Sequence, residues 1–237
     1  MKYGTSRLAV TLGSFLTVLA VARGSTATHA RAGALEYVEG NAFVNGKTVQ
    51  GNADQLPILD DGSALRTGKG HAEMLLTPGV FLRLDAMTEV RLVSASLTDT
   101  RIRLVRGAAM LEVDDLHKDN RIRVQVGGDT ARVLKTGLYR FQADPAVVEV
   151  LKGRVEVSDG DRHVKAGVHR EASLPALTVN KFKAADDDLS RWSRLRSEYE
   201  AEASVASAQY VFDRGLPWGY ADWFWNPWFD AWTWLPA

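Results

Sequence analysis

The stretch LDDGSALRTGKGHAEMLLTPGVFLRLDAMTEVRLVSASLTDTRIRLVRGAAMLEV, residues 59–113, alternates apolar and polar residues in short runs. Three of these runs centre on an arginine: VFLRL at 80–84, VRL at 90–92 and IRL at 102–104. A two-residue period places the apolar side chains of each run on one face of a strand. Glycines separate the runs, because Gly adopts the positive φ that tight turns require. We therefore expect antiparallel strands, each with one face towards water.

The same rhythm continues on both sides of this stretch. Asn45-Gly46 predicts a tight type I′ hairpin, and RIRVQV at 121–126 alternates without exception. The segments 102–113 and 148–157 repeat one pattern, in which a strand reaches a basic residue and Gly before a second strand begins. We expect an all-β domain over residues 33–180, either an antiparallel β-sandwich or a short β-solenoid of stacked hairpins. Its expected structural turns lie at Gly62, Gly79, Gly107, Gly137 and Gly153.

The order of turns and strands resembles the FecR-type domain, a bacterial periplasmic regulatory module. The resemblance covers roughly residues 33–172 and lies in glycine placement and strand rhythm, not in catalytic residues. The matching segments are Asp61-Gly62-Ser63, Arg66-Thr67-Gly68, Ala72–Leu76, Pro78-Gly79, Leu82–Leu84, Leu104–Gly107, Thr136–Phe141 and Val148–Val157.

This resemblance implies a sensor role, in which an envelope domain receives a signal from an outer-membrane partner and passes it to a sigma-factor-binding segment inside the cell. The cytoplasmic helical segment of that plan has no counterpart before the matching region. We therefore carry over an extracytoplasmic, non-catalytic interaction domain and not the anti-sigma activity.

The N-terminal residues 1–32 predict an export signal. Lys2 and Arg7 precede an apolar run at 8–22 that is shorter than the roughly 20 residues a membrane-spanning helix needs. Cleavage after Ala32 would leave Gly33 as the first residue, and Ser25-Thr26-Ala27 is a second candidate site. The alternative is an uncleaved helix that tethers the protein to the inner membrane. Either way, we expect an exported, periplasmic or envelope-associated protein.

Composition excludes several classes of protein. The chain has no Cys, which removes disulfides, thiolate nucleophiles, cysteine-ligated metals and a lipidated N-terminus. It has 29 basic and 29 acidic residues, and the signal holds four of the basic ones, so the remainder is slightly acidic. That balance gives no electrostatic footprint for nucleic acid or an anionic membrane.

No catalytic or cofactor motif appears in the sequence. The histidines after the signal, at 71, 117, 163 and 169, form no zinc motif, and neither a nucleophile elbow nor a phosphate-binding loop is present. Ser158-Asp159-Gly160-Asp161 lacks the ligand spacing of a calcium loop. We expect no enzyme activity, no cofactor and no metal site.

Residues 186–210 predict an amphipathic helix. Three aspartates begin it, and acidic residues favour a first turn. Its apolar stripe comprises Leu189, Trp192, Leu195, Tyr199 and Ala203, and its expected wet face carries Arg191, Arg194, Arg196, Glu198, Glu200 and Glu202. We expect the stripe to pack on the β domain or on a second copy.

Residues 211–237 form a tail rich in Trp and Pro, which we expect to be irregular because Pro217, Pro227 and Pro236 interrupt it. Three roles fit it: covering an apolar face of the β domain, binding an envelope protein or a glycan such as peptidoglycan, or shallow insertion at a membrane interface. The candidate interaction residues are Trp218, Tyr220, Trp223, Trp225, Trp228, Trp232 and Trp234.

Overall fold

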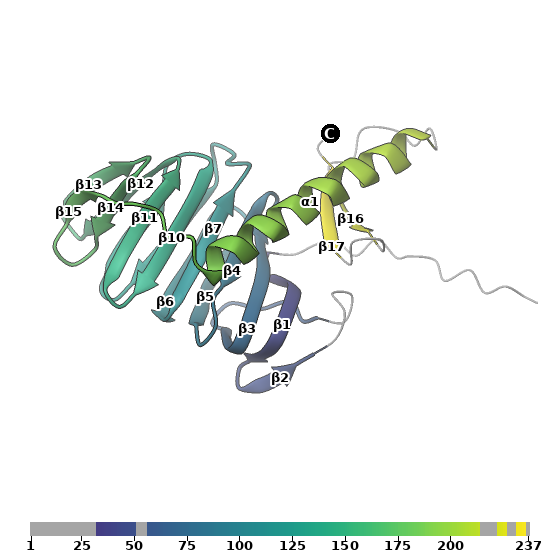
Figure 1. Ribbon diagram of the computed structural model, residues 1–237, viewed down its shortest axis with the longest axis horizontal. Coiled ribbons are helices and arrows are strands. Elements are labelled where there is room, and N and C mark those ends of the chain that lie inside the picture. The colour runs from purple at the N-terminus through teal and green to yellow at the C-terminus, as the bar shows by residue number, and fades with distance from the viewer. Residues whose placement is uncertain (1–31, 51–55, 214–221, 227–230, 236–237) are drawn as a thin grey trace, which may run out of the picture.

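The computed structural model describes residues 32–50, 56–213, 222–226 and 231–235, so the predicted signal lies outside the described residues. The described chain is mostly β, with one long helix towards its C-terminus (Figure 1). The helix α1 spans Asp188–Asp213. The strands are β1 Ala34–Val44, β2 Lys47–Val49, β3 Ala64–Thr77, β4 Val80–Leu84, β5 Glu89–Ser96, β6 Asp99–Arg106, β7 Ala108–Val113, β8 Arg121–Val126, β9 Asp129–Val133, β10 Gly137–Ala143, β11 Ala146–Lys152, β12 Arg154–Asp159, β13 Arg162–Gly167, β14 Arg170–Ser173, β15 Thr178–Lys181, β16 Asp222–Asn226 and β17 Ala231–Leu235.

One continuous sheet holds the first fifteen strands, and it folds over on itself. Along its main path the strand order is β13-β12-β9-β8-β6-β5-β3-β4-β7-β10-β11-β14-β15, with β1 paired to β3 and β2 to β1. Strand β10 lies across from β6 and β8, and the end strand β13 lies beside β14 and β15. The sheet is therefore barrel-like and nearly closed, with two halves that face each other.

The long strands β1 and β3 turn the sheet from one half to the other. The first residues of β3 pair with β5, and its last residues pair with β4 on the opposite half. Gly40 and Gly70 oppose each other at this bend, and both have positive φ. A Cβ on Gly70 would lie 1.9 Å from the Glu39 carbonyl oxygen, so only Gly allows the two backbones to approach this closely.

The alternating runs of the sequence fill the space between the two halves. In β6 and β8, every second residue is buried and the residues between are largely exposed or half-buried. The largest buried core side chains include Leu65, Met74, Leu82, Leu84, Leu92, Tyr139 and Phe141. Burial of this apolar set is the main force that holds the folded-over sheet together.

Three predictions from the sequence can be compared directly with these elements. The mostly β architecture and the long helix after it are confirmed. The hairpin at Asn45-Gly46 is also confirmed, since Val44 pairs with Lys47 and both loop residues have positive φ. The fifteen strands of the folded-over sheet run from Ala34 to Lys181.

The expectation of an irregular tail is wrong for ten of its residues. Strands β16 and β17 pair antiparallel, with Trp223 opposite Trp234 and Trp225 opposite Trp232. All three prolines fall outside these strands, which are rich in aromatic residues that favour β structure. The hairpin lies beside α1, and β17 also approaches β1 (Figure 1). Trp218, Tyr220 and Trp228 lie outside the described residues.

Among the described residues, no helix combines the length and apolar character needed to cross a membrane.

Candidate functional site: a buried ionic seam under the helix

Helix α1 packs on the outer face of the sheet half that contains β4 and β7 (Figure 1). Its apolar stripe is only partly buried: Leu189, Trp192 and Ala203 are covered, whereas Leu195 and Tyr199 are 45% and 43% exposed. The prediction of the solvent-exposed face is also wrong at two positions, Arg196 and Glu200. Both are buried, together with Ser193 and Ser207. The helix therefore turns a largely polar side towards the sheet.

The sheet beneath the helix carries matching charges. Glu73 on β3 pairs in register with Arg83 on β4, and Glu112 on β7 lies opposite Phe81 on the same strand β4. These side chains point away from the core, where the sequence predicts a face towards water, yet Glu73 and Arg83 are 0% exposed because α1 covers them. We call Glu36, Glu73, Arg83, Glu112, Arg196 and Glu200 the ionic seam.

Arg83 is the centre of the seam. Its Nε donates to Glu73 Oε2 at 2.5 Å, and its Nη1 donates to Glu112 Oε2. The same Nη1 donates to the hydroxyls of Ser193 and Ser197 on the helix, at 3.1 and 2.9 Å. Arg83 thus links three elements that are far apart in the sequence, and its charge is balanced within the buried region.

Arg196 anchors the helix from the other side. Its Nε and Nη2 donate to Glu73 Oε1 at 2.9 and 2.6 Å, and Nη2 also donates to Glu200 Oε1 at 2.9 Å. Its guanidinium lies 4.4 Å from the centre of the Tyr37 ring, a cation–π contact. Burial opposes the charge of Arg196, but Glu73 more than offsets this and raises the pKa of the guanidinium, so Arg196 stays charged.

Glu36 differs from the other carboxylates because it is fully buried and has no hydrogen-bond partner in the part of the chain that the structure describes. It lies at a register irregularity of β1, between Leu35 and Tyr37. Neither of its oxygens accepts a hydrogen bond from the described residues. Burial, with added repulsion from Glu200 and Glu73, raises the pKa of Glu36 well above its ordinary value. The same causes, burial first and then Glu73, raise the pKa of Glu200 to about 8.

The N-terminal end of α1 is fixed by a second set of contacts. His71 on β3 stacks on Trp192 with ring centres 4.7 Å apart, and Trp192 Nε1 donates to Glu39 Oε2 at 2.9 Å. His71 Nε2 lies 3.4 Å from Asp85 Oδ1, an interaction that raises the pKa of His71 although burial opposes it. Both ends of the covered part of the helix are therefore tied to the sheet.

Asp187 caps α1 and binds the sheet at the same time. Its Oδ1 accepts from the Ser190 backbone N–H at 3.0 Å, and its Oδ2 lies 2.5 Å from Nη2 of the largely buried Arg140. Burial raises the pKa of Asp187, but the hydrogen bonds from Arg140 and Ser190 outweigh it and lower the pKa to about 2.

Replacing Asp187 with Ala is expected to cost about 1–3 kcal/mol of stability, because it removes a helix cap and the partner of Arg140. Asp187→Asn keeps the cap and should cost less. The lowered pKa means that the charge of Asp187 stabilises the fold above its ordinary pKa and that this contribution disappears as pH falls towards 2. Urea unfolding at pH 7 and pH 3 measures both effects; equal losses for the two variants at pH 7 would contradict the capping role.

The predicted turn glycines all have positive φ, and two of them join the halves of the sheet. Gly107 links β6 to β7, and Gly153 links β11 to β12. In both copies of the repeated sequence pattern, the chain therefore crosses from one half of the sheet to the other at the glycine. A Cβ on Gly107 would lie 2.3 Å from Thr88 Oγ1, and one on Gly153 would lie 2.1 Å from the Tyr139 hydroxyl.

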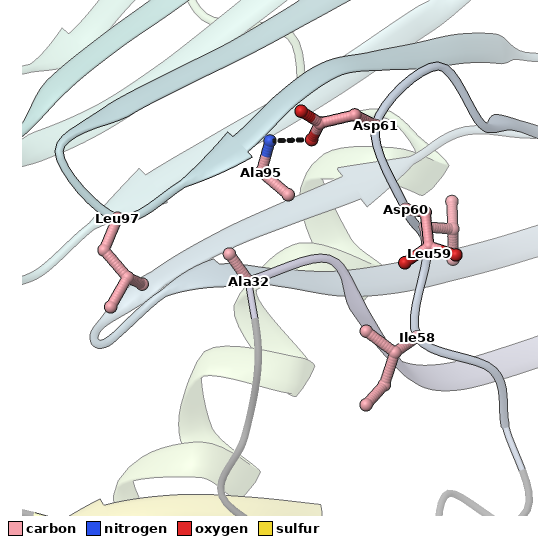
Figure 2. A pocket seen from close by; sticks show the side chains of 7 residues that line it. All are labelled: Ala32, Ile58, Leu59, Asp60, Asp61, Ala95 and Leu97. Atoms are coloured by element: carbon pink, nitrogen blue, oxygen red, sulfur yellow. Dashed lines mark hydrogen bonds between the residues drawn. The ribbon is translucent and has the colours of Figure 1, made fainter.

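A separate hollow of about 560 Å³ opens beside Ala32, the first described residue (Figure 2). Asp61 on its rim is engaged, because its Oδ1 accepts from the Ala95 N–H at 2.6 Å. The other lining residues are Ile58, Leu59, Asp60 and Leu97. They form no constellation of catalytic groups.

The sequence held only indirect signs of the seam. Glu73 and Arg83 each interrupt an apolar run, and Arg196 and Glu200 have the spacing of a helical ion pair. Each of these patterns is also typical of a solvated surface. These residues are buried, and not on a solvated surface, because the helix covers the sheet. That packing brings together residues more than a hundred positions apart.

Part of the β domain is similar to a known protein family. The model of the FecR protein family matches residues 63–156, from the start of β3 into β12. The resemblance predicted from the turns and strands of the sequence is therefore confirmed over these residues. No curated protein matches the chain.

Two crystal structures of a proposed anti-sigma factor from Parabacteroides distasonis, at 2.50 and 1.65 Å resolution, are similar to the chain. Each has 17% sequence identity and a TM-score of 0.43, and the similarity covers 54% of this chain. It covers 63% of the other chain, so the match spans less than two thirds of that protein.

Proposed function

We propose that this protein is an exported, non-catalytic FecR-domain protein of the cell envelope that acts by binding another protein, in signalling or scaffolding. The observation that carries the proposal is the FecR match at residues 63–156, because this family consists of regulators rather than enzymes. The anti-sigma description belongs to the similar crystal structures and is not part of the proposal.

The exposed apolar side chains of α1 are the surface that suits such a partner best. Leu195 and Tyr199 flank the buried part of the apolar stripe and are 45% and 43% exposed. The ionic seam holds the helix against the sheet, so these side chains are presented on a fixed element. Apolar side chains on a rigid helix can enter a partner's groove without a large loss of conformational entropy.

A photo-crosslinking residue at position 199 tests this surface in the bacterial envelope. We expect one specific crosslinked product from position 199 and none from position 165, an exposed lysine on β13 at the far end of the sheet. Without a crosslinker, the double variant Leu195→Ala/Tyr199→Ala should retain at least tenfold less of the protein identified by crosslinking than the unmodified chain does. Equal labelling from both positions would contradict the proposal.

Glycan binding is the second candidate, and the paired tryptophans of β16 and β17 favour it because aromatic rings stack on sugars. Peptidoglycan sacculi should then retain the full chain and release a chain that ends at Asp213. If sacculi retain neither form, protein binding is favoured. If phospholipid vesicles retain only the full chain, the hairpin instead contacts the membrane interface.

Export predicts a defined N-terminus. Cleavage after Ala32 would leave Gly33, whose backbone N–H already donates to the Leu75 carbonyl at 2.8 Å, so the mature chain would begin at the edge of the folded domain. We expect intact mass spectrometry of the protein from the envelope fraction to give the mass of residues 33–237. A mass that includes Met1 would contradict cleavage and favour a retained anchor.

A further inference from the structure

The charges of the ionic seam do not balance among its own members. Four carboxylates, Glu36, Glu73, Glu112 and Glu200, face two guanidinium groups, Arg83 and Arg196. With every carboxylate ionised, the seam has a net charge of −2 in a region that water hardly reaches. Burying unpaired charge costs several kcal/mol per ion, so something must neutralise it.

The unpaired charge is concentrated at one point. Glu73 is held by both arginines, and Glu112 accepts from Arg83 and from the Ser197 hydroxyl. Glu36 has no hydrogen-bond partner among the described residues, although it is completely buried. One oxygen from each of Glu36, Glu73 and Glu200 lies within 4.8 Å of the other two. The unpartnered carboxylate of Glu36 is therefore directed at two other acidic groups.

We propose that Glu36, Glu73 and Glu200 bind a divalent cation, with Ca²⁺ preferred, at the point where α1 crosses β1 and β3. One such ion supplies the two positive charges that the seam lacks. It would join the helix to the sheet through one carboxylate from each of three elements that the chain brings together only on folding.

Ligand chemistry and spacing select the ion. All three donors are carboxylate oxygens, a set that suits hard cations better than Zn²⁺, whose sites usually include His or Cys. Ca²⁺ binds oxygen at about 2.3–2.6 Å, so oxygens on opposite sides of one ion are about 4.6–5.2 Å apart, which accommodates the separations here. Mg²⁺ requires about 2.0–2.1 Å and keeps several waters, a poor fit to a buried site.

Titration of the chelator-treated full chain with CaCl₂ tests the site. Calorimetry is expected to find one Ca²⁺ per chain. Because a ligand that binds only the folded state stabilises it, saturating Ca²⁺ should raise the unfolding temperature by more than about 5 °C. Mg²⁺ at the same concentration should raise it less.

Two variants make the assignment specific. Glu36→Gln should abolish the Ca²⁺ response while unfolding at a higher temperature than the unmodified chain in chelator, because it removes the unpaired charge. Glu200→Gln provides the same test if Glu36→Gln does not fold. Glu198→Gln, on the exposed side of the same helix, is the matched control and should keep the full response.

Tb³⁺ luminescence gives a second readout, since Tyr37 and Trp192 lie beside the seam and can sensitise a bound lanthanide. Addition of Ca²⁺ should displace the signal. The proposal is overturned if Ca²⁺ changes neither heat nor unfolding temperature, or if the response survives both glutamine variants. Absence of any Ca²⁺ response would mean that protons neutralise Glu36 and Glu200. A response that survives both variants would mean that the ion binds elsewhere.

Discussion

Arg83→Met should lower the free energy of unfolding by about 3–5 kcal/mol, the range for removing one partner from a buried ion pair. Methionine occupies much of the volume of the arginine stem, so the loss comes chiefly from charge and hydrogen bonding. Glu73 and Glu112 would each lose a charged donor, and Ser193 and Ser197 on α1 would lose their contacts with β4. Chemical unfolding followed by circular dichroism measures the change.

Two further variants control this experiment. Arg103→Met removes an arginine from an exposed position of β6 and should cost less than about 1 kcal/mol. Adding Glu112→Gln to Arg83→Met should recover part of the lost stability, because it removes one of the stranded charges. A loss below about 1 kcal/mol for Arg83→Met would mean that the seam is not a stabilising link between helix and sheet.

Gly153→Ala should destabilise the protein by about 3 kcal/mol or more. Gly153 has a φ of 101°, and a Cβ there would lie 2.1 Å from the Tyr139 hydroxyl oxygen and 2.7 Å from the Thr136 carbonyl oxygen. The Tyr139 hydroxyl accepts from the Arg154 N–H at 3.0 Å and donates to the Lys135 carbonyl at 2.5 Å. The methyl group would force a buried tyrosine out of these bonds, in addition to straining the backbone.

Gly160→Ala separates the two contributions. Gly160 also has positive φ, at 83°, but a Cβ there would have no described atom within 4 Å. Its substitution should therefore cost only the backbone strain, about 1–2 kcal/mol. Similar losses at positions 153 and 160, measured by urea unfolding, would show that the contact with Tyr139 is not what requires glycine.

The strand positions of this protein follow from its sequence because they depend on local properties. In runs such as VFLRL and RIRVQV, alternation places apolar side chains on one face of the strand whatever the neighbouring strands are. Asn45-Gly46 favours a hairpin through its own backbone preferences. The glycines at 107 and 153 were predicted as turns, and each has positive φ at a bend where the chain crosses between the two halves of the sheet. The start of the helix Asp188–Asp213 is also set locally, because the preceding Asp187 caps its first turn.

The structure of the tail does not follow from its local sequence. Its prolines indicated an irregular segment, whereas β16 and β17 lie between them and pair with each other beside α1. The pairing depends on the register of two segments with α1 as a neighbour, and proline positions alone do not contain that information.

By itself, the sequence determined a mostly β domain with FecR-like turns, followed by one helix. It did not determine which of the polar faces that it predicted to be exposed to solvent are in fact exposed. Alternation gives the two sides of a strand or helix different characters, but it does not say what covers the polar side. Only the tertiary structure decided that α1 lies over β3 and β4, where Glu73, Arg83, Arg196 and Glu200 are buried together. The reason is physical: a charged side chain is stable in the interior only when its partners are buried with it. Here the partners that α1 supplies, such as Arg196 for Glu73, come from a segment more than a hundred residues away.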